Sequence, residues 1–589
     1  MMTNLIKRTT QRMSTNCSLP SLGRGKGVGL LFVGMFCSFF ALTSCEDILD
    51  TDSDFVMYEK DNTLSDPTDS IYSVLGIINQ MQKIADRTVL LGEVRADLVT
   101  PTEAASADLK RLAAWDFSQE NKYNAVSDYY SVINHCNYFL HHVDTTLQRR
   151  GYKIFEAEYA AVKGFRAWTY LELAKNYGRI PLVTEPLMTE QDARKAMNDQ
   201  SKYADMQTIC NYFINDLTPY AYRRMPNWGS INGSNSQYFF IPIRALLGDL
   251  CLWAGRYQEA ATWYHDYMTD RDDPIIITAS RIGGGWGNIH FTSHVMTSGS
   301  YELSYIPMEA RQFDGIMSEL PDLFNSTERN YRYFQLTPSV GIRRLSGEQI
   351  YCMEHKTDTQ TDTLYAPREG LDDPLDLGDM RLYASYFHSE SGSQNQYSEY
   401  NNETQSIRKY SSNTEERIPT YTKSMLYLRY AEALNRAGYP QSAMVVLKYG
   451  MCQDNLIAYV DSVERQAAGI LIEFDPNVYL QQDAKGIHSF GSGESQCNKY
   501  YVLPMPADSL ATRQDTIDYQ IPLVEDMIID EMALEFAFEG HRLHDLMRVA
   551  MRRGDNAYLA DPISRRDGEE DAALRAKLMN EQNWYLPLP

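Results

Sequence analysis

The sequence predicts a mainly α protein, in which a tetratricopeptide-type helical scaffold carries a loop-rich insertion with little β structure. Two observations predict the scaffold. Apolar and small residues recur at steps of three and four from about 65 to 270, and two segments share one spacing of small and large residues. A third observation predicts the insertion: helical periodicity stops from about 270 to 415, where glycine, serine, aspartate and tyrosine predominate.

The first 44 residues have the pattern of a secretory signal. The run from Val28 to Leu42 is apolar, follows a basic stretch and ends in small residues, and its 15 residues are too few for a confident transmembrane span. The tetrapeptide LTSC, which ends at Cys45, resembles the lipobox of bacterial lipoproteins. That resemblance implies that the Cys45 sulfur carries a lipid and that the cleaved chain begins there. An ordinary signal cut elsewhere is the alternative, and either Met1 or Met13 fits as the start.

Residues 45–64 are predicted to be a lipidated, acidic tether. Its aspartates suggest a calcium loop, but Phe55 occupies the place where such a loop needs glycine. The signal holds five Lys and Arg residues and no Asp or Glu, so its removal changes the net charge from −23 to −28. A surface with this charge repels phosphate backbones and anionic bilayers, which argues against nucleic acid as a partner.

Residues 65–589 are predicted to form a single domain, with scaffold helices at about 65–270, 415–450 and 520–550. Small side chains mark one stripe of a helix over 160–174, so another helix should approach closely there. Gly178 ends this helix and Pro181 prevents its resumption.

The repeat signal is clearest at 245–267, in ALLGDLCLWAGRYQEAATWYHDY. Small residues let the two helices of a hairpin touch, glycine makes the turn, and a large aromatic fills the space between them. The same offsets return nearly two hundred residues later. The first set is Gly248, Gly255, Ala260 and Tyr264, and the second is Ala431, Gly438, Ala443 and Leu447. At least three such pairs must stack to bury their faces, and others are expected within 125–180.

Several segments together resemble the SusD/RagB family of outer-membrane nutrient-binding lipoproteins. They are CEDILD after the lipobox, LGEVRADLV (91–99), FRAWTYLELAKNYGRIPLV (165–183), LYLRYAEALNRAG (426–438) and EFAFEGHRLHDLMR (535–548). The resemblance implies a SusD-like helical scaffold with an irregular ligand-binding face, acting as a lid on a SusC-like TonB-dependent transporter. It also implies a lipid anchor at Cys45 in the outer membrane, with the protein exposed at the cell surface.

No catalytic constellation emerges from the sequence. Glu531, Glu535 and Glu539 follow one another at steps of four, but carboxylates on one helix face point the same way, whereas a glycosidase must flank a sugar from two sides. A structural ion-pair network is favoured, with Arg542 and Arg548 as partners of Glu539 and Asp545. Zinc at His541 and His544 lacks a third ligand. No catalytic or metal residue is predicted, and no cofactor, although calcium ordering an acidic loop such as LDDPLDLGDMR stays open.

Aromatic residues in loops are the predicted ligand contacts. Trp286 lies in GGGWG and Trp228 in RRMPNWGSINGS, while Tyr301 and Tyr305 lie at the edge of the insertion. An exposed ring of this kind can stack on the apolar face of a sugar. The alternative is that these rings only fix long loops to the scaffold. Three further tryptophans fall within helical patterns and are expected in the core: Trp168, Trp253 and Trp263.

Together these features predict a non-enzymatic, surface-anchored protein that captures oligosaccharides and passes them to the transporter. Peptide or glycopeptide capture on the same scaffold, a surface glycosidase and a pure assembly scaffold are the alternatives. The sequence does not name the ligand or the surface that faces the transporter.

Overall fold

The structure is a computed structural model, and it describes most of the chain after the predicted tether. The described residues are 64, 67–277, 282–285, 288–291, 301–308, 316–324, 335–349, 351–356, 359–366, 378–379, 381, 386–388, 405–407, 409–410, 417–493, 501–507 and 512–588. They belong to one compact unit. The predicted signal and almost all of the predicted tether, including Cys45, lie outside the described residues, so both stay predictions.

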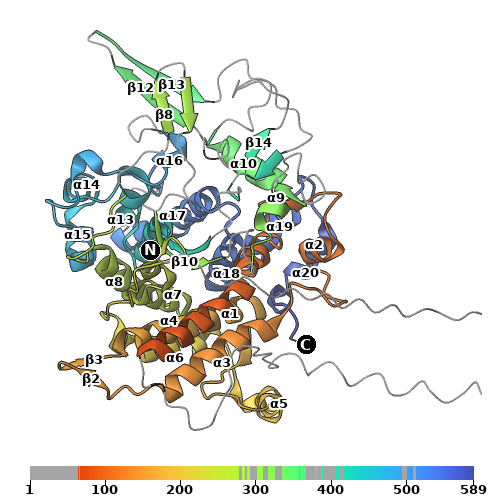
Figure 1. Cartoon of the computed structure of the whole chain (residues 1–589). Helices are drawn as coiled ribbons and strands as arrows, with labels where there is room; N and C mark the ends of the chain where they lie inside the picture. The colour runs from red at the N-terminus through yellow and green to blue at the C-terminus, as the bar shows by residue number, and fades with distance from the viewer. Residues whose placement is uncertain are drawn as a thin grey trace, which may run out of the picture. The chain divides into compact units, whose positions relative to one another are not determined.

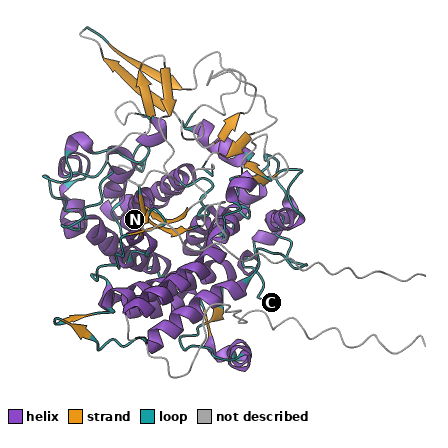
Figure 2. Ribbon diagram, viewed as in Figure 1, coloured by secondary structure: helices purple, strands orange, loops and turns teal. Residues whose placement is uncertain are grey.

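Helices make up most of the described chain (Figure 2). The main ones are α1 (Pro67–Glu93), α3 (Val126–His142), α4 (Glu156–Tyr177), α6 (Met206–Leu217), α7 (Ile243–Trp253), α8 (Tyr257–Met268), α12 (Lys423–Arg436), α17 (Arg513–Glu535) and α18 (Arg542–Arg553). Shorter helices are α2 (Ala107–Ala113), α5 (Glu190–Asn198), α9 (Leu320–Phe324), α10 (Val340–Glu348), α13 (Pro440–Met444), α14 (Gln453–Tyr459), α15 (Ser462–Ala468), α16 (Ser489–Ser492), α19 (Ala557–Ser564) and α20 (Ala572–Leu578). Among the described residues, every helix is too short or too polar to cross a membrane.

The helices pack in a continuous order. α1 packs on α3, α3 on α4, α4 on α6, α6 on α7, α7 on α8 and α8 on α12, and α12 then contacts both α13 and α17 (Figure 1). Each helix therefore buries one face on the helix before it and another on the helix after it, which is how stacked hairpins form one core. The pair α3–α4 fulfils the expectation of a further hairpin within 125–180.

The strands form separate two-stranded antiparallel pairs (Figure 2). The pairs are β1 (Val99–Pro101) with β11 (Leu336–Pro338), β2 (Gln148–Arg149) with β3 (Tyr152–Lys153), β4 (Ile180–Pro181) with β5 (Tyr203–Ala204), β6 (Ser230–Ile231) with β7 (Ser234–Asn235), β8 (Ile282–Gly285) with β9 (Asn288–Phe291), β10 (Glu302–Pro307) with β16 (Arg417–Thr422), β12 (Tyr351–Lys356) with β13 (Thr361–Ala366), and β14 (Tyr386–His388) with β15 (Gln405–Ile407). The prediction of a mainly α fold with little β structure is confirmed.

The hairpin of α7 and α8 has the geometry that its spacing predicts. Gly255 turns the chain at φ 74°, and Gly438 takes φ 97° at the matching place in the second hairpin. A Cβ on Gly248 would lie only 2.3 Å from the ring of Tyr264, so the glycine lets the aromatic ring fill the space between the helices. The Tyr264 hydroxyl then donates to Asp249 at 2.6 Å.

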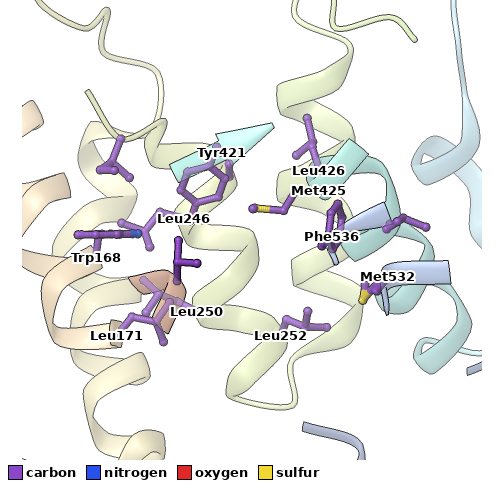
Figure 3. Close-up of a cluster of buried hydrophobic side chains, with 14 of the residues drawn as sticks. Trp168, Leu171, Leu246, Leu250, Leu252, Tyr421, Met425, Leu426, Met532 and Phe536 are labelled. Atoms are coloured by element: carbon purple, nitrogen blue, oxygen red, sulfur yellow. The ribbon is translucent and has the colours of Figure 1, made fainter. Parts of the chain in front are cut away.

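The core extends from α4 through α7 and α12 to α17. Figure 3 shows side chains from these helices, from β16 and from the residue after α17 meeting in one apolar cluster. Those labelled are Trp168, Leu171, Leu246, Leu250, Leu252, Tyr421, Met425, Leu426, Met532 and Phe536. The small-residue stripe predicted a close neighbour along one face of α4, but every residue from 160 to 177 is buried. Other parts of the chain therefore cover α4 on all of its faces.

Four segments that carry the family resemblance meet in the interior. Arg95 donates to Asn176 of α4, Asp97 pairs with Arg542 of α18 at 2.8 Å, and Glu432 of α12 pairs with Arg548 of α18 at 2.7 Å. All six side chains are buried. These buried pairs hold the scaffold together.

One carboxyl group in this interior, that of Glu93, should give the free energy of unfolding an unusual pH dependence. Burial raises the pKa of Glu93 from 4.5 to about 8, although Gly540 donates a backbone hydrogen bond to it at 2.9 Å. Because the folded-state pKa lies above the unfolded value, the stability linked to this proton is full below pH 4.5 and is lost as the pH rises through 8. The variant Glu93→Gln has no titrating carboxyl group at this position, so it should not lose this stability.

We therefore expect the free energy of unfolding of Glu93→Gln, relative to the unmodified protein, to increase between pH 5 and 8. The gain should be at most about 1.4 kcal/mol per pH unit, measured by urea denaturation at several pH values. Glu120→Gln, which alters an exposed glutamate, is the control and should run parallel to the unmodified protein. Parallel curves for Glu93→Gln as well would contradict the expectation.

Candidate functional site

The predicted ligand residue Trp286 lies outside the described residues. Gly285 of β8, which precedes it, pairs with Asn288 of β9. Stacking of Trp286 on a ligand stays a prediction.

Tyr301 and Tyr305 are both buried. The ring of Tyr305 lies 6.2 Å from that of Tyr238 and 5.7 Å from that of Phe239, and the guanidinium of Arg417 lies 5.3 Å from its centre. Tyr301 precedes β10, and its carbonyl accepts a hydrogen bond from the first residue of α12 at 2.9 Å. The expectation that these two rings are exposed is wrong, because both phenols pack into the frame at the edge of the insertion. Their contact with a ligand stays a prediction that this burial does not support.

Trp228 is half-buried in the loop between η2 (Thr218–Tyr220) and η3 (Ser236–Phe239). Its Nε1 donates to Glu158 at 3.2 Å, and its ring meets Phe240 edge to face at 5.2 Å. The Trp228 backbone N–H donates to Ser236 at 2.8 Å, which closes the loop around the β6–β7 pair. The indole is therefore held in one orientation with part of its surface open to solvent.

Further aromatic rings lie close to this loop. Tyr159 and Tyr220 are 5.6 Å apart, and Tyr222, which is 69% exposed, lies 6.3 Å from Trp263 of α8. Tyr222 is exposed, whereas Tyr159, Tyr220 and Trp263 are partly covered. The same loop carries two ion pairs, Arg223–Glu156 at 3.2 Å and Arg224–Asp272 at 3.0 Å. An exposed ring beside charged hydrogen-bonding groups can contact both the apolar face and the hydroxyl groups of a sugar.

Sequence reasoning identified Trp228 but missed Tyr222 and placed Trp263 in the core. Trp168 is buried as expected, whereas Trp263 is only partly covered. The helical spacing around Trp263 shows that it lies on α8 but does not show which face of α8 stays open. Tyr222 follows the end of α6 without any distinguishing motif.

The three glutamates at steps of four belong to a buried ion-pair network. Arg381 pairs with Glu531 at 2.6 Å and with Glu535 at 2.9 Å, and Lys409 pairs with Glu539 at 2.6 Å. Of the two predicted ion pairs, one is confirmed and the other is wrong. Arg548 does pair with Asp545 at 2.7 Å, but Arg542 pairs with Asp97. The prediction of a structural network is confirmed.

Glu539 is not on the same helix as the other two glutamates, contrary to expectation. α17 ends at Glu535, and Phe538 and Gly540 take φ 72° and 91° before α18 begins. His544 is buried and His541 is partly buried. Loss of hydration lowers the pKa of both imidazoles well below its usual value. No cluster of three or more metal-ligating side chains occurs in the described parts of the chain.

Comparison with known proteins identifies the fold. No family model and no curated protein matches the chain. A SusD-like carbohydrate binding protein from Bacteroides fragilis NCTC 9343 superposes with a TM-score of 0.51 and 14% identity, over 84% of this chain and 88% of that one. The chain has the SusD-like fold.

Two further solved structures agree. A SusD homolog from Bacteroides thetaiotaomicron VPI-5482 has a TM-score of 0.50 and 12% identity, over 91% of this chain and 96% of that one. Surface glycan-binding protein A from Bacteroides fluxus has a TM-score of 0.50 and 14% identity, over 86% and 91%. At these identities the likeness concerns the SusD-like fold and not individual binding residues.

Proposed function

We propose that this protein is a non-enzymatic, surface-exposed lipoprotein that captures oligosaccharides and delivers them to a SusC-like TonB-dependent transporter in the outer membrane. The observation that carries the proposal is the SusD-like fold over more than four fifths of the chain, shared with proteins described as carbohydrate-binding and glycan-binding. Lipidation at Cys45 would hold the protein at the membrane, because each buried methylene contributes about 0.8 kcal/mol.

The non-enzymatic part is supported by the glutamates that could have formed a catalytic pair. Glu531 and Glu535 are buried and engaged by Arg381, so neither can act on a sugar in solvent. Retaining and inverting glycosidases both need two carboxyl groups that flank the scissile bond.

The test is binding of the soluble chain, from residue 46 onward, to starch, β-glucan, xyloglucan, xylan, mannan, pectin, mucin glycans and a set of peptides. Release of reducing sugar is assayed in the same samples. Retention by a glycan without hydrolysis is the expected result. Hydrolysis would make the protein a glycosidase, and retention by peptides alone would make it a peptide-capture protein. Delivery is tested by co-purification with the transporter from detergent-solubilised outer membranes.

Single aromatic substitutions should weaken glycan binding measurably. If a sugar face covers roughly 60 Å² of an indole, the lost burial is about 1.5 kcal/mol, or about tenfold in Kd. We expect about this effect for Trp286→Ala and a smaller one for Trp228→Ala, because Trp228 is half-covered by Phe240 and Glu158. Isothermal titration calorimetry measures both.

The matched control for the aromatic substitutions is Tyr152→Ala, which removes a ring that is 80% exposed on the β2–β3 hairpin. Its affinity should stay unchanged. If all three variants bound as tightly as the unmodified protein, the aromatic contacts would have to lie elsewhere.

A further inference from the structure

A polar groove of about 300 Å³ opens between α10 and α19. On the α10 side the lining residues recur at positions i, i+3, i+4 and i+7, which is one helix face. The lining consists of Asp97, Gly341, Arg344, Leu345, Glu348, Asp561, Pro562 and Arg565. Its volume is at the lower end of the range for small-molecule sites, which suits a single sugar ring.

The walls of the groove are fixed by backbone contacts. The Gly341 N–H donates to the carbonyl of Arg566 at 3.1 Å, and Ser339 donates its hydroxyl to the carbonyl of Asp97. A Cβ on Gly341 would lie 2.7 Å from that same carbonyl, so only glycine allows α10 to lie so close. The groove is therefore formed before any ligand arrives, which reduces the entropy lost on binding.

Three of the charged groups in the groove already have partners. Asp97 is held by Arg542 at 2.8 and 2.9 Å, Asp561 by Arg575 at 2.7 Å, and Arg565 by Glu570 at 2.6 Å. The other two, Arg344 and Glu348, form no hydrogen bond or ion pair with any residue that the structure describes. They lie one helical turn apart on the same face of α10.

We propose that this groove binds one neutral pyranose unit of a glycan through its hydroxyl groups. One hydroxyl accepts a hydrogen bond from the Arg344 guanidinium, and a neighbouring hydroxyl donates one to the Glu348 carboxylate. The proposal rests on the proposed function and adds a second mode of contact, because the groove lining has no aromatic ring and cannot stack on a sugar.

The charges favour a neutral ligand. The two groups without partners have opposite signs and cancel. An anion would face the carboxylates of Asp97, Glu348 and Asp561, and a cation would face the guanidinium groups of Arg344 and Arg565. A hydroxyl group both donates and accepts hydrogen bonds, so neighbouring hydroxyl groups of a polyol can accept from a guanidinium and donate to a carboxylate beside it. α10 also lies within the 270–415 insertion that the sequence predicts to bind ligand.

The experiment uses the glycan retained in the binding panel and compares the variants Arg344→Ala and Glu348→Gln by isothermal titration calorimetry. We expect Kd to increase at least tenfold for Arg344→Ala and about fivefold for Glu348→Gln. Neither side chain has a partner to lose, so both variants should melt within a few degrees of the unmodified protein.

The matched control is the Glu190–Arg194 pair of α5, which has the same residue types four positions apart on an exposed helix surface. Glu190→Gln and Arg194→Ala should leave Kd unchanged. If a glycan is retained and both groove variants bind it as tightly as the controls do, the groove proposal is overturned while the proposed function stands. If no glycan is retained, both fall. If Arg344→Ala weakens binding of acidic oligosaccharides and Glu348→Gln strengthens it, the ligand is an acidic sugar and the neutral-pyranose proposal is overturned.

Discussion

Gly540→Ala is expected to abolish stable folding or to reduce the free energy of unfolding by about 4 kcal/mol or more. A Cβ at position 540 would lie 2.1 Å from the carbonyl oxygen of Thr88 and 2.6 Å from the Cα of Val89, and both are backbone atoms of α1. Backbone cannot rotate away as a side chain can, so α1 would have to separate from the turn between α17 and α18. The separation would also stretch the hydrogen bond from the Gly540 N–H to the buried Glu93.

The steric effect of the Cβ at position 540 can be separated from the cost of a positive φ angle. Gly554, the C-cap of α18, also has a positive φ, 63°, but a Cβ there would meet no atom within 4 Å. Gly554→Ala should therefore cost only about 1–2 kcal/mol. Thermal and urea denaturation of both variants measure the difference. Equal losses would show that backbone strain, and not the contact with α1, limits position 540.

This contact explains why the sequence predicts one helix where two exist. EMALEFAFEGHRLHDLMR keeps apolar and charged residues at helical steps across the break, so periodicity alone continues the helix through Gly540. The break comes from a tertiary requirement: α1 lies so close that Gly92 and Gly540 meet without side chains, with a Cβ on Gly92 only 1.8 Å from the Gly540 carbonyl. Local pattern carries no information about a partner more than four hundred residues away.

The repeats were predictable because their information is local. Gly248, Gly255 and Tyr264 lie within seventeen residues, and the packing of α7 on α8 involves only that segment. The pairing of β1 with β11 joins residues more than two hundred positions apart, and no sequence feature indicated it. The candidate site shows the same limit. Aromatic content marks Trp228 and Tyr305 alike, but only packing decides that Trp228 keeps an open face while Tyr305 lies between other rings.

Arg548→Met is expected to reduce the free energy of unfolding by about 3–5 kcal/mol. Arg548 donates to both carboxylate oxygens of Glu432, at 3.1 and 2.7 Å, and to Asp545 at 2.7 Å, and all three side chains are buried. Removing the guanidinium leaves two carboxylates without this partner in a medium of low dielectric constant. Glu432 keeps Arg436 as a partner at 2.7 Å, so most of the loss falls on Asp545.

Two comparisons test this assignment of the loss. Arg513→Met removes a guanidinium from an ion pair with Asp461 in which both side chains are about 40% exposed, and it should cost at most about 1 kcal/mol. The double variant Arg548→Met with Asp545→Asn neutralises the stranded carboxylate and should recover part of the loss. A double variant that is less stable than the sum of its two single changes would mean that Asp545 contributes beyond this pair. Recovery would show that the residues joining α12 to α18, which carry part of the resemblance in sequence, stabilise the frame through this buried ion-pair network.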